Sequence, residues 1–292
     1  MAKSSYFGIL NINKPKGITS FDVVARLRKI LNTKKIGHTG TLDPLAQGVL
    51  PICVGDATRI IEYLPSGKAY RAYAKLGLTS NTYDLEGELS EPQKVGTTKE
   101  AIIEALKAFE GEIEQTPPIF SAIKIKGKKL YEYARKNEEV EIPKRTVTVS
   151  KIEFVDFQQG ENPIVIFDVE CSAGTYIRSI IHDLGQNLGC GAIMVDLIRT
   201  KANGFEIAQS QDLNNLCAEE AIFIDPLAQI DLSEIKISSV ELEKIKLGQS
   251  FWVENENIGM TKLSYEDKLV AIAEQNEKKV SPKKVFCTSF AV

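Results

Sequence analysis

Alternating apolar and polar residues predict several strands that bury one face. The alternation is clear in three ranges: 69–78, 146–157 and 163–173. An unbroken apolar run at residues 49–54 is typical of a strand buried on both faces. A first strand is predicted at residues 6–11, just before the turn-forming sequence Asn13-Lys14-Pro15-Lys16-Gly17.

Apolar residues at helical spacing predict three helices. The first begins at Ser20, a candidate N-cap, and runs to about residue 32. Its buried stripe would comprise Phe21, Val24, Leu27 and Leu31. The second covers residues 98–110, where Thr97 and Glu100 have capping-box spacing and Gly111 marks the end. The third covers about 175–188, and its buried stripe would comprise Ile177, Ile180, Ile181, Leu184 and Leu188.

Strands and helices are mixed without a regular strand–helix–strand alternation. We therefore expect an α+β fold with a mixed, largely antiparallel sheet and flanking helices. Residues 37–48 hold three Gly, one Pro and two Thr, which predicts a loop. Residues 119–145 are basic and poor in apolar residues after Ile125, as in an inserted arm. Beyond about residue 230, strand-like pieces at 250–253, 269–273 and 285–288 indicate a small C-terminal β domain.

The composition of the 292-residue chain is that of an ordinary globular protein, with 43% hydrophobic and 26% charged residues. These values exclude collagen-like, disordered and disulfide-scaffold classes. No apolar run approaches the ~18 residues of a membrane span, and residues 1–10 lack the apolar stretch of a signal peptide. The five Cys are scattered, which suits a reducing compartment. We therefore expect a cytoplasmic protein without a membrane partner.

The net charge of −3 and the pI of about 5.7 argue at first sight against a nucleic-acid partner. This average hides segments of opposite sign. Residues 1–75 carry a net charge of +8 and residues 119–151 carry +5, whereas residues 205–270 carry −8. Such segments either form surface patches or reflect chance variation along a solvated surface. Charge alone leaves both interpretations open.

Asp43 lies in the Gly- and Thr-rich loop between Leu42 and Pro44. A carboxylate on a rigid loop acts as a nucleophile or general base, or else it caps a turn. His38, in the same loop, either contacts a substrate or is hydrogen-bonded locally. Arg178 lies at the start of a predicted helix, where an Arg either pairs with a carboxylate or is exposed.

Metal and nucleotide motifs are not found in the sequence. His182 lies off the apolar stripe of its helix, so we expect a surface role for it. Two isolated His and scattered Cys give no metal constellation. The phosphate-binding and dinucleotide-binding Gly motifs are absent. The segment 37–40 partly matches the His-x-Gly-His motif of nucleotidyltransferases. Position 41 is Thr rather than His, so the match to this motif is incomplete.

Seven segments, taken together and in order, resemble one family closely. They are KPKGITSF (14–21), GHTGTLDPLAQGVLPICVGDATR (37–59), KAYRA (68–72), TYDLEG (82–87), QTPPIFSAIKIKGKKLYEYAR (115–135), GTYIRSIIHDLG (174–185) and DLIRT (196–200). The family is that of the bacterial tRNA pseudouridine synthases acting on uridine 55 of the T-loop. The resemblance covers roughly residues 6–230, and its Gly-His-Thr-Gly-x-Leu-Asp-Pro motif is highly specific.

The resemblance implies a pseudouridine synthase fold with a catalytic domain at residues 1–230, an RNA-binding arm at 119–150 and a small RNA-binding PUA-like domain at 231–292. It implies an isomerase that breaks the N1–C1′ bond of uridine, turns the base and rejoins it through C5, without metal or cofactor. The partner is the T-arm of tRNA, whose target base must leave its stack. We expect a monomer. The alternative is a non-catalytic tRNA-folding factor that binds the same arm.

The resemblance also assigns roles to residues. Asp43 is the nucleophile, Arg178 pairs with it, and Tyr70 stacks on the target base. The expected substrate-binding residues are His38, Tyr176, Leu197, Lys14 and Asp84. The expected RNA-binding residues of the arm are Lys124, Lys126, Lys128, Lys129, Tyr131 and Arg135. The chain departs from the family at Asn81, where an Asp is usual, so no ionic role is expected there.

Overall fold

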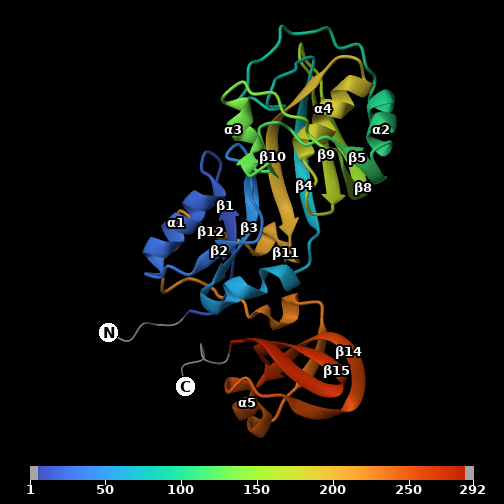
Figure 1. The fold of residues 1–292 in the computed structure, drawn as a ribbon. Helices are drawn as coiled ribbons and strands as arrows, with labels where there is room; N and C mark the ends of the chain where they lie inside the picture. Colours follow the sequence, from blue (N-terminus) through green and yellow to red (C-terminus); the bar gives the residue numbers. More distant parts are fainter. Residues whose placement is uncertain (1–5, 287–292) are drawn as a thin grey trace. The chain divides into compact units, whose positions relative to one another are not determined.

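The computed structural model describes residues 6–286, which fall into two compact units. The first unit contains the chain up to Pro65 and the chain from Ala202 onward, and the second unit contains Ser66–Lys201. The second unit is therefore an insertion in the sequence of the first. Figure 1 shows the ribbon coloured along the sequence.

The first unit combines N-terminal and C-terminal elements. Its elements are β1 (Gly8–Lys14), α1 (Ser20–Ile30), β2 (Ile36–His38), β3 (Gln47–Val54), the 3-10 helix η1 (Gly55–Tyr63), β11 (Phe205–Glu206), η2 (Ile207–Gln209), β12 (Gln211–Asp212), η3 (Pro226–Gln229), β13 (Ser233–Lys236), α5 (Ser239–Lys246), β14 (Phe251–Tyr265) and β15 (Lys268–Val285). Strand β1 pairs antiparallel with β3 and parallel with β12, and β2 pairs antiparallel with β3. Apolar residues of α1, β1 and β3 form one core cluster.

Thr19, rather than the predicted Ser20, caps α1. Its side chain accepts a hydrogen bond from Asp22 N over 3.1 Å, and the Asp22 carboxylate accepts one from Thr19 N over 2.8 Å. The Ser20 side chain faces the interior, and the next residue is rotated about 100° away from it. Phe21 is consequently 62% exposed, and Val23 joins the buried stripe. The predicted burial of Phe21 was wrong, whereas the other three predicted stripe residues are buried.

Two strands extend into segments that the sequence predicts as turn or loop. Strand β1 continues through Asn13 and Lys14, which pair with Val49 and Gly48 of β3. Strand β2 includes His38, within the predicted loop, and pairs with β3. Hydrogen-bonding partners on β3 satisfy the backbone of these residues, and this tertiary pairing outweighs their weak local preference for a strand.

The C-terminal part of the first unit is a three-stranded sheet, in which β13 is parallel and β15 antiparallel to β14. It has an apolar core of its own, which includes Phe251 and Leu263. The predicted short strand pieces are instead two long strands with register shifts between Trp252 and Asn257 and between Leu263 and Ser264. Residues 287–288 of the last predicted piece lie outside the described residues, as does Cys287. The PUA-like assignment stays a prediction.

The second unit is a sheet with two helices packed on it. Its elements are β4 (Lys68–Leu76), α2 (Lys99–Lys107), β5 (Gly111–Gln115), β6 (Lys124–Ile125), β7 (Lys128–Lys129), α3 (Leu130–Ala134), β8 (Arg145–Gln158), β9 (Ile164–Cys171), α4 (Ile177–Asn187) and β10 (Ala192–Ala202). The order of its main strands is β10-β4-β9-β8-β5, and the pairs β4–β9, β8–β9 and β5–β8 are antiparallel. Helix α4 contacts β4, and α2 contacts β8 and α4. The predicted α+β fold with a mixed sheet is confirmed.

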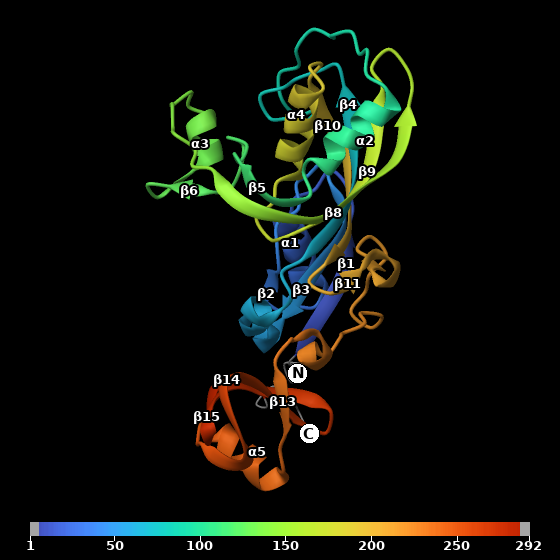
Figure 2. The same ribbon diagram turned by 90° about the vertical axis from the view of Figure 1, so that its right-hand side faces the viewer.

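The one-sided alternation predicted for β4 is confirmed. Tyr70, Ala72, Ala74 and Leu76 are all buried, whereas the residues between them are partly exposed. Helix α2 begins one residue later than predicted, because Thr98 rather than Thr97 accepts the hydrogen bond from Ala101 N. Figure 2 shows the β6 hairpin and α3 to one side of the strands of this unit.

Candidate active site

The loop that carries Asp43 is held on both sides of that residue. Leu42 donates its N–H to Ser20 Oγ over 2.8 Å, and the Ser20 hydroxyl donates to Leu42 O over 3.0 Å. On the other side, Gly17 N donates to Pro44 O over 2.8 Å. Ser20 and Leu42 are buried, whereas Asp43 is only half-buried. The carboxylate is thus partly accessible on a fixed backbone, as a nucleophile or general base requires.

The Lys14 side chain contacts backbone oxygen atoms of the residues that follow it and of the same loop, including Pro44 O next to Asp43. Its side chain is fully buried, and Nζ lies 2.7 Å from Ile18 O, 3.0 Å from Pro15 O and 3.5 Å from Pro44 O. A buried ammonium group needs such acceptors, because burial without them is costly. These contacts hold the loop, while the substrate contact expected of Lys14 stays a prediction.

His38 lies on β2, opposite Ile52 of β3, and is partly exposed. The next residue, Thr39, donates its N–H to Pro51 O over 3.1 Å. The Thr39 side chain lies 2.6 Å from Asn203 Oδ1, to which its hydroxyl donates. His38 therefore begins the Asp43 loop from a paired strand. Its contact with RNA stays a prediction.

Arg178 is buried at the start of α4 and is surrounded by oxygen atoms of the second unit. Nη1 donates to Thr82 O over 3.1 Å, and Nη2 donates to Phe120 O over 3.1 Å. Nη1 also lies 3.4 Å from Asp84 Oδ2, and both side chains of this ion pair are less than a tenth exposed. The sequence leaves two interpretations of Arg178, an exposed side chain or one paired with a carboxylate. The structure supports pairing with a carboxylate. Asp43 belongs to the first unit, so its pairing with Arg178 stays a prediction.

Asp84 is fixed within a tight turn. Its Oδ1 accepts hydrogen bonds from Thr82 Oγ1 over 2.6 Å and from Glu86 N over 3.0 Å. Its backbone forms a parallel bridge to Met194 of β10. The structure therefore shows Asp84 as a partner of Arg178, and its expected substrate contact stays a prediction.

Asn81 has a hydrogen-bonding role in the same turn. Its Oδ1 accepts a hydrogen bond from Glu88 N over 3.1 Å, a bond that either an amide or a carboxylate oxygen can accept. A side chain on Gly87 would place its Cβ 2.3 Å from that same Oδ1, so a larger residue there would displace the Asn81 side chain. The neutral Asn is therefore compatible with the turn.

Tyr176 is held through its backbone by Gln115, a residue to which sequence reasoning gave no role. Tyr176 N donates to Gln115 Oε1 over 2.7 Å, and Gln115 Nε2 donates to Tyr176 O over 3.0 Å. Helix α4 is anchored again nearby, where Ser179 Oγ donates to Thr116 O over 2.8 Å. The sequence did contain a signal for Gln115, because the residue begins one of the family-like motifs. The sequence alone, however, gives no hydrogen-bonding partner for its side chain.

Tyr70 and Leu197 are buried on β4 and β10, with 7% and 5% of their surfaces exposed. Tyr70 pairs with Val169 of β9, which pairs with Ile152 of β8, so the three side chains lie on one face of the sheet. Stacking of Tyr70 on a base and packing of Leu197 under it stay predictions.

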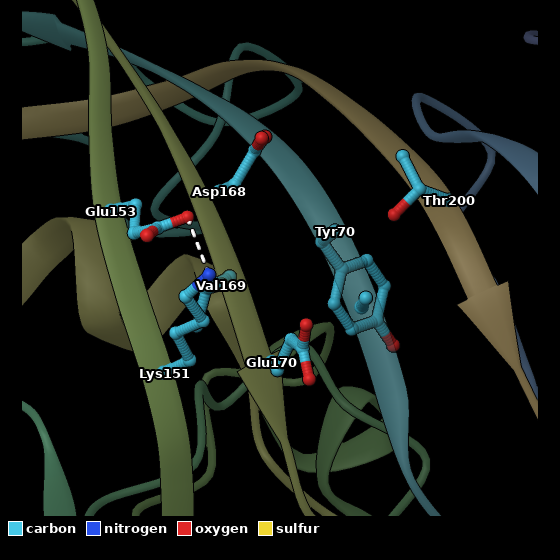
Figure 3. Close-up of a pocket in the computed structure, with 8 residues that line it drawn as sticks. Tyr70, Lys151, Glu153, Asp168, Val169, Glu170 and Thr200 are labelled. Atoms are coloured by element: carbon cyan, nitrogen blue, oxygen red, sulfur yellow. Dashed lines mark ion pairs between the residues drawn. The ribbon is translucent and has the colours of Figure 1, made fainter.

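A recess of about 130 Å³ on this sheet is lined by Tyr70 and Val169 together with charged residues of β8 and β9 (Figure 3). Its charged lining residues are Lys151, Glu153, Asp168 and Glu170. These residues alternate with Ile152 and Val169, whose side chains lie on the Tyr70 face. Arg71 also binds Asp168 through two hydrogen bonds of 2.8 Å. Four charged side chains therefore surround the part of this recess beside Tyr70, and we do not assign the uridine to it.

The predicted basic arm, residues 119–150, contains the β6–β7 hairpin and α3, and its last residues belong to β8. Lys126 and Gly127 form the turn of the hairpin with φ of 49° and 84°, as a two-residue hairpin requires. The guanidinium of Arg135 and the ammonium of Lys129 lie 5.3 and 5.4 Å from the centre of the Tyr131 ring. The other three predicted arm residues differ in their surroundings. Lys128 pairs with Glu138 over 2.7 Å, whereas Lys124 and Lys126 are exposed.

Other classes of site find little support within residues 6–286. No group of His, Cys, Asp and Glu in this part of the chain could hold a metal ion. No helix there is long and apolar enough to cross a membrane. Burial raises the pKa of the Cys53 thiol to about 12 and that of Cys171 to about 11, so neither is a reactive thiolate at neutral pH.

Comparison with known proteins gives matches over most of the chain. The family described as TruB family pseudouridylate synthase (N terminal domain) matches residues 28–177, and the tRNA pseudouridylate synthase B C-terminal domain matches residues 178–230. A tRNA pseudouridine synthase B of Clostridium kluyveri is 47% identical over 83% of this chain and 84% of its own length. One of Heliobacterium mobile is 42% identical over 93% of this chain and 91% of its own.

A solved structure with the same fold is a chain of a Cbf5-Nop10-Gar1 complex, with a TM-score of 0.71 and 30% identity. The similarity covers 97% of this chain and 85% of that one. The resemblance found in the sequence agrees with the family matches, with the fold of this solved chain and with the fixed Asp43 loop. This chain belongs to the TruB family of pseudouridylate synthases.

Proposed function

We propose that this chain converts uridine 55 in the T-loop of tRNA to pseudouridine, with Asp43 as its nucleophile. The observation that carries the proposal is the fixed loop of Asp43. The sequence of this loop is the most specific motif of the chain, and it lies inside the segment that matches the family. The fixed backbone supports a carboxylate whose position is set before the substrate arrives.

The reaction is an isomerisation, so its atoms and electrons balance within the substrate. The N1–C1′ bond breaks, the base turns, and a C5–C1′ bond forms. C5 loses a proton and N1 gains one. Asp43 acts by attack at C1′, by attack at C6, or by deprotonation of the sugar. No oxidant, reductant or phosphoryl donor enters this balance, so we expect turnover without a cofactor or a catalytic metal.

The second unit provides the other proposed catalytic groups. Arg178, oriented by Thr82 O, Phe120 O and Asp84, provides a fixed positive charge. We propose that this charge keeps Asp43 ionised. Tyr70 stacks on the flipped base and assists proton removal from C5. Tyr176 and Leu197 shape the pocket around the base, and stacking there returns about 1–3 kcal/mol of the cost of flipping.

We propose that the basic arm, residues 119–150, closes on the T-arm. The exposed Lys124 and Lys126 would contact phosphates, and Tyr131 with its two cations would contact the loop. The arm is expected to be disordered without RNA. Comparing the hydrogen exchange of residues 119–150 with and without tRNA tests this, because equal protection in both would contradict it.

The remaining parts of the proposal concern organisation. Residues 1–230 would form the catalytic domain, and residues 231–292 a PUA-like RNA-binding domain. His38, Lys14 and Asp84 would contribute to binding of the substrate. We propose a monomer that acts in the cytoplasm, where unmodified tRNA is available.

The experiment that tests the proposal is the Asp43→Asn substitution, assayed on an unmodified tRNA transcript. The variant should form no pseudouridine and should still bind the tRNA, because the amide keeps the shape of the loop but is not a nucleophile. Asp56→Asn is the matched control, since Asp56 pairs with Lys35 on the surface of the same unit. Retained turnover in Asp43→Asn would refute the assignment.

A non-catalytic tRNA-folding factor is the alternative function. The comparisons do not favour it, because the named relatives are tRNA pseudouridine synthases. If this chain were a tRNA-folding factor, the wild-type protein and the Asp43→Asn variant would refold the T-arm equally well. Both would leave uridine 55 unchanged.

A further inference from the structure

The His182 ring is stacked on the Tyr83 ring. The catalytic proposal gives no role to either residue. The ring centres are 3.9 Å apart and the planes are inclined by 15°. His182, for which a surface role is predicted, is half-buried, and its Nδ1 atom is buried without a hydrogen-bond partner within residues 6–286. The face of the ring, rather than a hydrogen bond from this nitrogen, makes the contact.

The stack lies directly beside the Arg178 site. Arg178 and His182 are four residues apart on α4, so their side chains lie on the same side of the helix. Arg178 bonds to Thr82 O and to the Asp84 carboxylate. Tyr83, the residue between these two partners, stacks on His182. Three consecutive turn residues, Thr82 to Asp84, thus contact Arg178 or His182 on one face of α4.

Tyr83 has a backbone conformation that its side chain does not favour. Its φ is +64°, in the left-handed region, which is rare for bulky residues. Its N–H donates to Ser80 O over 3.3 Å, and its carbonyl oxygen accepts from Met194 N over 2.9 Å. Such a conformation persists when its surroundings hold it. The ring stack adds a side-chain restraint to these two backbone bonds.

We infer that His182 is a positioning residue for the isomerisation: its ring holds Tyr83 and thereby fixes the oxygen atoms that orient Arg178. This inference rests on the proposed function, because Arg178 is assigned its role there. Loss of the stack lets Tyr83 leave its left-handed conformation, and Thr82 O and Asp84 then shift away from the guanidinium. The chemical step suffers more than tRNA binding, because most of the proposed tRNA contacts are made by other residues.

The test compares His182→Ala with His182→Phe, which keeps a flat ring without nitrogen atoms. Single-turnover rates and tRNA dissociation constants are measured at a temperature where all variants are folded by circular dichroism. Since small misplacements of a catalytic group cost up to about a hundredfold in rate, we expect the rate of His182→Ala to fall at least about tenfold and its tRNA affinity to fall much less. His182→Phe should restore most of the rate. Gln186→Ala, at an exposed position one turn further along α4, is the matched control.

Substitutions of Tyr83 provide an independent test. Tyr83→Gly removes the ring and frees the backbone, because glycine adopts many conformations besides the left-handed one, so it should lose rate as His182→Ala does. Tyr83→Phe should stay close to wild type. Combining Tyr83→Gly with His182→Ala should cost no more than either alone, because both remove the same contact.

Three results would overturn the inference: a normal rate in His182→Ala, equal losses in His182→Phe and His182→Ala, or a normal rate in Tyr83→Gly. The proposed function fails separately. In that case the wild-type protein forms no pseudouridine, whereas failure of the inference alone leaves wild-type turnover intact.

Discussion

The ion pair between Arg178 and Asp84 gives the sharpest test of the energetics of the second unit. Both side chains are buried, with 7% and 5% exposed, and the Nη1–Oδ2 distance is 3.4 Å. Asp84→Asn removes the negative charge and places an amide near the guanidinium. Oδ1 of the new Asn can still accept from Thr82 Oγ1 and Glu86 N, so the turn itself is preserved.

The magnitude follows from burial. Removing one partner of a buried pair costs about 3–5 kcal/mol, because the other charge stays buried without compensation. Here Arg178 keeps two carbonyl acceptors, Thr82 O and Phe120 O. We therefore expect Asp84→Asn to lower the free energy of unfolding by about 2–3 kcal/mol, below the usual range.

The matched control is Asp168→Asn on the outer face of the same sheet. Asp168 binds Arg71 through two hydrogen bonds of 2.8 Å, a better geometry, but the side chains are 40% and 42% exposed. An exposed pair contributes about 0–1 kcal/mol. Urea unfolding followed by circular dichroism compares the two variants. The reasoning is refuted if Asp84→Asn costs no more than Asp168→Asn.

Three further outcomes are expected. Ser20→Ala removes both hydrogen bonds to Leu42 and should lower turnover more than tRNA affinity, whereas equal losses in both would show that the Asp43 loop does not depend on them. Asn81→Asp should leave thermal stability close to wild type, because the acceptor for Glu88 N remains, while Asn81→Ala should lower it measurably. Burial lowers the pKa of His182, so the unfolded chain binds the proton more readily, and stability is lost as pH falls through about 6.5. Between about pH 7.5 and 5.5, the melting temperature should therefore fall further in wild type than in His182→Phe, and parallel curves would contradict this.

Local pattern was sufficient for elements whose burial follows a simple period. Strand β4 is an example, because alternation predicts that it buries one face, and Tyr70, Ala72, Ala74 and Leu76 are all buried on that face. Helix α1 shows the limit of such reasoning. Thr19 and Ser20 are both suitable N-caps by type, and only the bonding of Ser20 to a loop 22 residues away decides between them.

The C-terminal strands show a second limit. Residues 254–257 of β14 are Glu, Asn, Glu and Asn, so the alternation that predicts a strand is lost there. The structure accommodates this stretch through a register shift between Trp252 and Asn257. Pairing with β15 maintains the strand where local pattern fails, and pairing between distant segments is not visible in a single sequence.

The candidate site divides in the same way. Motifs found Asp43 and Arg178, because their sequence context is specific. The partners of Arg178 are two backbone carbonyl oxygens and a carboxylate from segments far from it in the sequence. Backbone acceptors leave no signature in residue type, so Thr82 and Phe120 could not be predicted. The stack of His182 could not be predicted either, because its partner, Tyr83, lies in a turn with an unusual backbone conformation.

The central claim is that this chain isomerises one uridine of the T-loop, and release of tritium tests it most directly. In a tRNA transcript labelled at C5 of every uridine, each pseudouridine formed releases one C5 hydrogen, because C1′ takes its place. We predict one tritium per tRNA with wild type, none with Asp43→Asn, and none with a transcript that has cytidine at position 55. Absence of release from the normal transcript, or equal release from the cytidine-55 transcript, would contradict the account.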